Sequence, residues 1–218
     1  EAIAAGGNLD AYAGPDSLLL DDGTAPERFA ASATNQYAKY AFDSQNQGTA
    51  KPGVTFALGA DKADAKSADG ALTFNATSTR GDRAGWAAIG RRFDPPLDLA
   101  GAAAIGFWLR GDGRGQSFKV QLRDTAGKWH DMVTPVTFSG WRYIEHRLDK
   151  PALDLARIEY LLLFYNGLPA ATGVLCAVDD IKAIRSSAYL ETPILTVGES
   201  QLSVPVRLYP GQRLRSRD

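Results

Sequence analysis

Three β-rich runs of the sequence carry aromatic, amide and guanidinium groups on one side of each run. Side chains of an extended strand alternate between two faces, so residues two apart share a side. Flat rings stack on the C–H faces of sugars, and Arg, Gln and Glu reach vicinal hydroxyl groups with directed hydrogen bonds. A plain solvated face would be richer in Lys, Thr and Ser. The rows expected to face outward are Trp108 and Arg110, Gln121 and Arg123, and Tyr143, Glu145 and Arg147.

The opposite side of each run is apolar, which indicates strands that lie on a core. We expect the three strands to be neighbours, so that their outer rows line one water-facing groove. Trp129 follows a turn at Gly127 and is expected at the rim of this groove. The alternative is a solvated sheet face with one stray tryptophan. The apolar rows are Ile105, Phe107 and Leu109, then Phe118, Val120 and Leu122, then Ile144 and Leu148.

These runs belong to a longer series of short strands that predicts an all-β fold. Between Leu97 and Ile184, β-rich runs are cut by glycine turns with no helical period, which is typical of an antiparallel β-sandwich. We expect earlier strands at 17–22, 54–58, 71–76 and 85–93, the last two forming a hairpin, with 59–70 as an exposed loop. Asp94-Pro95-Pro96 is expected to end the strand before it.

Composition excludes several classes of protein. The 218 residues hold 24 Lys and Arg against 25 Asp and Glu, so no overall field favours nucleic acid or an anionic membrane. There is no apolar run long enough to span a bilayer. The single cysteine, Cys176, excludes an intrachain disulfide and is expected as a small buried hydrophobe. Because the chain starts at Glu1, we expect a trimmed or processed chain, with 1–16 as a leader or flexible segment.

Several short motifs of the sequence fit a known pattern of structural residues. They are Gly111-Asp112-Gly113-Arg114-Gly115, then Val120, Leu122 and Asp124 before Gly127, then Gly140-Trp141, and a terminal Asp179-Asp180-Ile181. Over roughly residues 17 to 186 the chain resembles the jelly-roll carbohydrate-binding modules, galactose-binding-like β-sandwiches of secreted polysaccharide-degrading enzymes. The resemblance implies a jelly roll over 17–188, with 189–218 as a linker and the start of a following domain.

The resemblance also implies a function and a location. Such modules bind poly- or oligosaccharide without cleaving it, in a concave groove, and are covalently linked to a catalytic domain. The protein would be secreted, or held at the cell surface or in the periplasm. The alternative is a structural or interaction sandwich that packs on a neighbouring catalytic domain. Which glycan and linkage it binds, and its oligomeric state, do not follow from the sequence.

A structural calcium between the first and last strands is a further implication of the resemblance. The matching positions are Asp22, with Asp21 as the alternative, and Asp179. A hard cation needs several oxygen ligands, so backbone carbonyls would complete the set. The alternative is that these carboxylates only cap turns and strand ends. By the same resemblance Trp141 is expected to pack at the edge of the core, while Trp86 stays ambiguous.

Motifs for catalysis are missing from the sequence. The sequence lacks the Arg-x-Glu-x-Arg and Gln-Ile-His motifs of similar lyases. It also lacks the Glu-x-Asp-x-x-Glu strand of similar hydrolases. His130 and His146 have no nucleophile elbow and too few ligands nearby for zinc. We therefore expect no enzyme activity and no nucleic acid or membrane partner. The local cluster of Arg80, Arg83, Arg91 and Arg92 is either solvated charge or a preference for acidic sugars.

Overall fold

The computed structural model describes residues 17–29, 48–67, 69–149, 151–185, 194–197 and 200–203. Within them, strands dominate and the helices are single 3-10 turns. The elements are β1 (Ser17–Asp21), η1 (Pro26–Phe29), β2 (Gly48–Ala50), β3 (Val54–Asp61), β4 (Ala71–Ser78), β5 (Gly85–Leu97), β6 (Ala102–Asp112), β7 (Ser117–Asp124), β8 (Trp129–Pro135), β9 (Ser139–Arg147), η3 (Leu155–Arg157), β10 (Ile158–Leu168), β11 (Gly173–Arg185), β12 (Ile194–Val197) and β13 (Ser200–Ser203).

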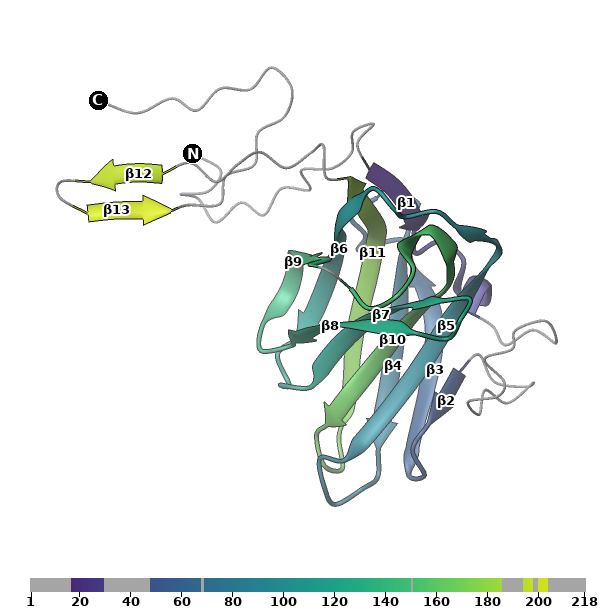
Figure 1. The fold of residues 1–218 in the computed structure, drawn as a ribbon. Coiled ribbons are helices and arrows are strands. Elements are labelled where there is room, and N and C mark those ends of the chain that lie inside the picture. The colour runs from purple at the N-terminus through teal and green to yellow at the C-terminus, as the bar shows by residue number, and fades with distance from the viewer. Residues whose placement is uncertain are drawn as a thin grey trace.

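Two antiparallel sheets pack face to face (Figure 1). Sheet A has the order β3-β4-β11-β6-β9, and β1 also pairs with β11; sheet B has the order β2-β5-β10-β7-β8. The all-β jelly-roll sandwich predicted from the sequence is confirmed. The first and last strands of the sandwich are neighbours, with Ser17 opposite Ile184. The pair β12–β13 forms a separate two-stranded sheet, and the predicted start of a following domain stays a prediction.

The core lies between the inner rows that the alternation predicted. Phe107 of sheet A and Phe118 of sheet B are both buried, with ring centroids 6.3 Å apart. Phe74 stacks on Tyr165 at 4.4 Å, and the Tyr165 hydroxyl donates a 2.6 Å hydrogen bond to the Phe74 carbonyl. Cys176 is buried beside them as predicted, and burial raises the pKa of its thiol to about 12. The thiol is therefore an inert part of the core.

Two predictions about strand connections were wrong. Strand β4 lies in sheet A and β5 in sheet B, so the segments 71–76 and 85–93 are not a hairpin but cross from one sheet to the other. Strand β5 also continues through Pro95 and Pro96 to Leu97. The prolines are tolerated because the pairing with β10 shifts register there, between Ile158 and Tyr160, where ladder hydrogen bonds are interrupted. Among the described residues no helix is long and apolar enough to cross a membrane.

Candidate functional site

The predicted ligand-binding residues lie on two opposite faces of the sandwich. Trp108 and Arg110 of β6 and Tyr143 and Glu145 of β9 are on the outer face of sheet A, whereas β7 and β8 belong to sheet B. The prediction of three neighbouring strands was therefore wrong. Alternation tells which residues share a side of one strand, but pairing between distant strands decides which sheet receives that strand. Gln121, Arg123 and Trp129 form the sheet B group.

On sheet A, the predicted water-facing position of Trp108 is wrong. Trp108 points away from the core but is only 7% exposed, and the Lys66 ammonium lies 5.0 Å from its ring centroid. The Tyr143 ring meets it edge-on at 5.5 Å. Tyr143 crosses over Gly106, where a Cβ atom would lie 2.0 Å from the tyrosine hydroxyl. Trp108 and Tyr143 are thus packed together, with Trp108 buried and Tyr143 half-buried.

Arg110 is also engaged within the protein. It makes ion pairs with Asp61, at 3.1 Å, and with Asp64, and its guanidinium lies 5.6 Å above the Trp141 ring. The Trp141 indole donates a 2.8 Å hydrogen bond to Asp64. This bond, followed by the contact with Arg110, lowers the pKa of the Asp64 carboxyl. Trp141 therefore packs on the outer face of sheet A rather than at the edge of the core.

The segment between β3 and β4 covers this part of sheet A because Asp179 holds it. The buried Asp179 carboxylate accepts hydrogen bonds from the Lys66 and Ser67 backbone amides, both at 2.8 Å, and from the Ser67 hydroxyl at 3.0 Å. The predicted loop at 59–70 begins later than expected, because β3 continues to Asp61; most of the described side chains after it are exposed. Its Lys66 and Asp64 nevertheless contact the tryptophans of the sheet below. The part of the outer face of sheet A around Trp108 and Trp141 is therefore covered by the chain itself.

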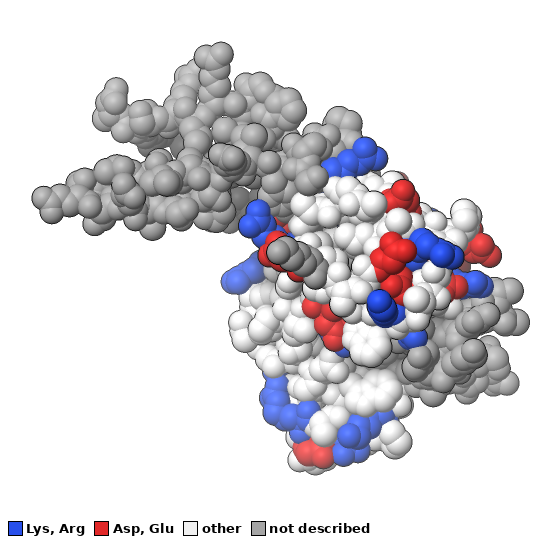
Figure 2. Space-filling view, in the orientation of Figure 1, with Lys and Arg blue, Asp and Glu red and all other residues white. Residues whose placement is uncertain are grey.

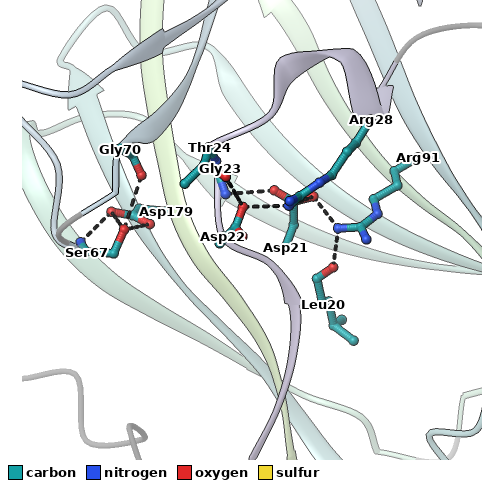
Figure 3. Close-up of polar contacts among 10 residues, drawn as sticks. All are labelled: Leu20, Asp21, Asp22, Gly23, Thr24, Arg28, Ser67, Gly70, Arg91 and Asp179. Carbon is teal, nitrogen blue, oxygen red and sulfur yellow. Dashed lines mark hydrogen bonds and ion pairs between the residues drawn. The ribbon is translucent and has the colours of Figure 1, made fainter.

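The carboxylates that the resemblance assigns to calcium accept hydrogen bonds from groups of the protein, and the calcium site stays a prediction. Figure 3 shows two separate groups of contacts, one around Asp179 and one around Asp21 and Asp22. Asp22 accepts from the Thr24 amide and hydroxyl, at 3.0 and 2.7 Å, and from Arg28 at 2.6 Å. The turn between the groups is filled, since a Cβ on Gly23 would lie 2.8 Å from the Val178 carbonyl oxygen. No group of three His, Cys, Asp or Glu among the described residues could hold a metal.

The pKa shifts of the two neighbouring aspartates reflect these surroundings. Burial is the largest influence on Asp21 and raises the pKa of its carboxyl, although the Gly23 amide and Arg91 act in the opposite direction. Burial would also raise the pKa of Asp22, but hydrogen bonds from Thr24 and Arg28 outweigh it and lower that pKa. Asp21 accepts from Gly23 and Arg91 on its two oxygens, whereas the donors to Asp22 all reach Oδ1.

Sheet B presents a different outer face. Its central strand β10 directs Tyr160, Leu162 and Phe164 outward, as a small apolar cluster separate from the main core. Tyr160 and Leu162 are buried, whereas Phe164 is half-buried under the Lys119 ammonium, 4.1 Å from the ring centroid. The flanking strands β7 and β8 add polar groups and one exposed indole.

Trp129 is that indole, and 59% of its surface is exposed. It lies directly opposite Arg123 on the neighbouring strand. In the next row outward-facing Gln121 donates a 2.5 Å hydrogen bond to Asp131, which also pairs with Lys119 at 3.1 Å. The Arg123 guanidinium lies close to the turn, where a Cβ on Gly127 would be 2.9 Å from Nη2. The structure thus brings together Gln121, Arg123 and Trp129, and adds Asp131 and Lys119, which the sequence analysis missed.

The predicted arginine cluster does not form a basic patch. Arg80 pairs with Asp82 at 2.8 Å, Arg92 pairs with Glu159 at 2.9 Å, and Arg83 donates to the Gly115 carbonyl at 2.9 Å. Arg91 belongs to the inner row of β5 and points toward β1 (Figure 3). Figure 2 shows Lys and Arg side chains lying among Asp and Glu side chains on the visible face. A preference for acidic sugars therefore has no support from this cluster.

The histidines and the described cavity form no site with the exposed indole. His130 follows Trp129 in β8 but alternation directs it to the opposite face of sheet B. His146 is half-buried against Phe107, and its Nε2 is 2.8 Å from the Thr134 hydroxyl. Burial, with a smaller contribution from His130, lowers the pKa of His146. A cavity of about 250 Å³ lies at the other end of sheet A, between Leu18, Leu99 and Ala183. Neither feature brings a nucleophile and a base together.

Comparison with known proteins gives similar structures but no sequence family. No family model and no curated protein matches the chain. Similar solved structures include the family 11 carbohydrate-binding module of a cellulosomal cellulase of Clostridium thermocellum, 15% identical with a TM-score of 0.48, covering 64% of this chain and 86% of that one. TmCBM61, solved in complex with β-1,4-galactotriose, is 17% identical with a TM-score of 0.42, covering 64% and 87%.

A longer enzyme is among the similar structures as well. The agarase AgWH50C is 13% identical with a TM-score of 0.49, and the match covers 78% of this chain and 25% of that one. Carbohydrate-binding modules are also the group that the sequence motifs between residues 111 and 181 resemble. Similarities of this degree do not decide the function, because one fold supports many ligands. The function is therefore argued from the site.

Proposed function

We propose that the protein binds carbohydrate without cleaving it, on the outer face of sheet B beside Trp129. The observation that carries this proposal is the exposed indole of Trp129 set next to Arg123. A large aromatic surface left in water at the edge of a sheet is a common feature of binding sites. In the next row of the same face Asp131 supplies a carboxylate, whereas Gln121, predicted to face water, is only 6% exposed and holds that carboxylate in place.

This combination suits a sugar better than most other ligands. The C–H face of a pyranose ring is apolar and packs on an indole, while its hydroxyl groups need donors and acceptors at the side. Asp131 already bonds to Gln121 and Lys119, so its carboxylate is held in place before a ligand arrives. Preorganised polar groups lose little freedom on binding. A shallow, wet face exchanges water for similar hydrogen bonds, so we expect a Kd on the order of micromolar or weaker.

We further propose that the sandwich is an ancillary module of a secreted or cell-surface enzyme that processes glycans. In this role it would bring a linked catalytic domain to its polymer. The competing hypothesis, an interaction sandwich, expects Trp108 to be covered by a separate domain. Lys66 and Tyr143 of the same chain already contact Trp108. The burial of Trp108 therefore does not favour that hypothesis.

Affinity electrophoresis on a panel of soluble polysaccharides, followed by calorimetry on the best ligand, tests the proposal. Trp129→Ala is expected to weaken binding by roughly 30-fold, the effect of losing an energetically dominant aromatic contact of about 2 kcal/mol. Leu175→Ala is the matched control, because Leu175 is also exposed (40%) but lies on sheet A. Unchanged affinity in Trp129→Ala, or an equal loss in Leu175→Ala, contradicts the assignment of the face. If no polysaccharide in the panel retards the wild-type protein, the proposed function itself is contradicted.

A further inference from the structure

Arg91 is a charged side chain in the inner row of a core strand. It lies on β5 between Ile89 and Phe93, which are both buried in the hydrophobic core. Alternation therefore directs its side chain into the sandwich and away from the outer face of sheet B. Its guanidinium stays partly accessible at the end of the sandwich, where the side chain is 23% exposed.

The partner of Arg91 is on the opposite sheet. Its Nη1 makes an ion pair with the Asp21 carboxylate of β1 and donates a 2.6 Å hydrogen bond to the Leu20 carbonyl (Figure 3). The Asp21 side chain is 1% exposed. Arg91 thus joins sheet B to the first strand of sheet A, and the ring of Phe93 supports the guanidinium at 5.1 Å.

The oxygens that Arg91 engages are the kind that a calcium ion prefers. They are one carboxylate and one backbone carbonyl on the first strand, and a hard cation would need several more such ligands. The other Asp21 oxygen accepts from the Gly23 amide at 2.7 Å, and the Arg28 guanidinium lies 4.0 Å from the carboxylate. A divalent ion would have to displace one guanidinium and sit beside a second. At Asp21, the alternative to Asp22 as a ligand of the calcium that the resemblance implied, a bound cation and the observed contacts therefore exclude one another.

We propose that Arg91 is the internal cation that fastens β1 to the sandwich, and that folding of this protein requires no divalent metal. The buried Asp21 charge is compensated by a side chain instead of a bound ion. The cost of removing this guanidinium is large, because the buried carboxylate then keeps only the Gly23 amide and the more distant Arg28 guanidinium. This inference is independent of the proposed function and holds whether or not the protein binds glycans.

Thermal unfolding of the full chain tests the proposal. The wild-type Tm is expected to change by less than about 1 °C between excess chelator and millimolar calcium. Arg91→Met, which keeps an unbranched apolar stem but removes the guanidinium, is expected to lower the Tm by about 10 °C in either buffer. The matched control is Arg80→Met, because the Arg80 side chain is 26% exposed but its partner Asp82 is 54% exposed. That variant is expected to change the Tm by no more than about 2 °C.

The double variant Asp21→Asn with Arg91→Met removes both charges and keeps the test valid if Arg91→Met alone does not fold. It is expected to be more stable than Arg91→Met, because the buried carboxylate that lost its closest cation is removed as well. A wild-type Tm that falls in chelator and recovers with calcium overturns the proposal. So does an Arg91→Met variant that unfolds at the same temperature as Arg80→Met.

Discussion

Replacing Trp108 is expected to damage stability, although its position in the sequence pattern marks it as a ligand contact. Trp108 is 7% exposed and contacts both Tyr143 and Lys66. Trp108→Ala leaves a space that the loop residues 62–67 and the Tyr143 ring can fill only in part. We expect no direct loss of a sugar contact, because the indole has almost no surface to offer.

The magnitude follows from the burial of the ring. Truncation of a buried tryptophan to alanine costs about 3–5 kcal/mol of unfolding free energy. The Lys66 contact adds on the order of 0.5 kcal/mol at a partly exposed position. We expect a decrease of about 3.5 kcal/mol for Trp108→Ala. Trp129→Ala removes a ring that is 59% exposed, and surface changes of this kind usually stay within about 0.5 kcal/mol.

Urea unfolding followed by circular dichroism, together with glycan affinity, separates the two tryptophans. With an m-value of about 2 kcal/mol/M, the expected midpoint of Trp108→Ala lies roughly 1.75 M below that of the wild type. The midpoint of Trp129→Ala is expected within about 0.3 M of the wild type. Affinity is expected to fall only in Trp129→Ala, measured where both variants are folded. The placement of the site on sheet B would be refuted if Trp108→Ala had wild-type stability but no longer bound glycan.

Two further predictions concern the loop anchor and a buried histidine. Asp179→Asn replaces a carboxylate oxygen that accepts hydrogen bonds from Lys66 and Ser67, so we expect the free energy of unfolding to fall by about 1–3 kcal/mol and trypsin to cleave faster after Lys66. Asp69→Asn, an exposed change in the same loop, is the control. Equal cleavage rates in the two variants would contradict the anchoring role. Burial lowers the pKa of His146, so the unfolded chain, with a His pKa of about 6.5, binds a proton first as the pH falls. The contribution of neutral His146 to stability is intact above pH 6.5 and is lost as the pH falls toward the folded-state pKa. Between pH 7.5 and 5 the Tm of His146→Gln should therefore decrease less than that of the wild type. An identical decrease in the two proteins would contradict this role of His146.

Alternation in the sequence was sufficient to predict the inner rows. Phe107 and Phe118 were assigned to the core side of their strands, and both are buried between the sheets. The rule works because each side chain's direction is fixed by the residues before and after it. The order of strands was less accessible, since β4 and β5 follow one another in sequence yet belong to different sheets. Any strand with an apolar row can pair in either sheet, and the shape of the whole core decides between them.

The sequence by itself determined that this chain forms an antiparallel sandwich, and it determined which side of each strand is apolar. Only the tertiary structure decided which outward side chains meet water. Asp179 reaches across 112 residues to hold Ser67, and through that contact the loop covers Trp108, while Trp129 on the other sheet stays open. Arg91 likewise finds Asp21 only because the two sheets face each other. Such contacts depend on the distance between segments in the folded chain, which local residue patterns do not contain.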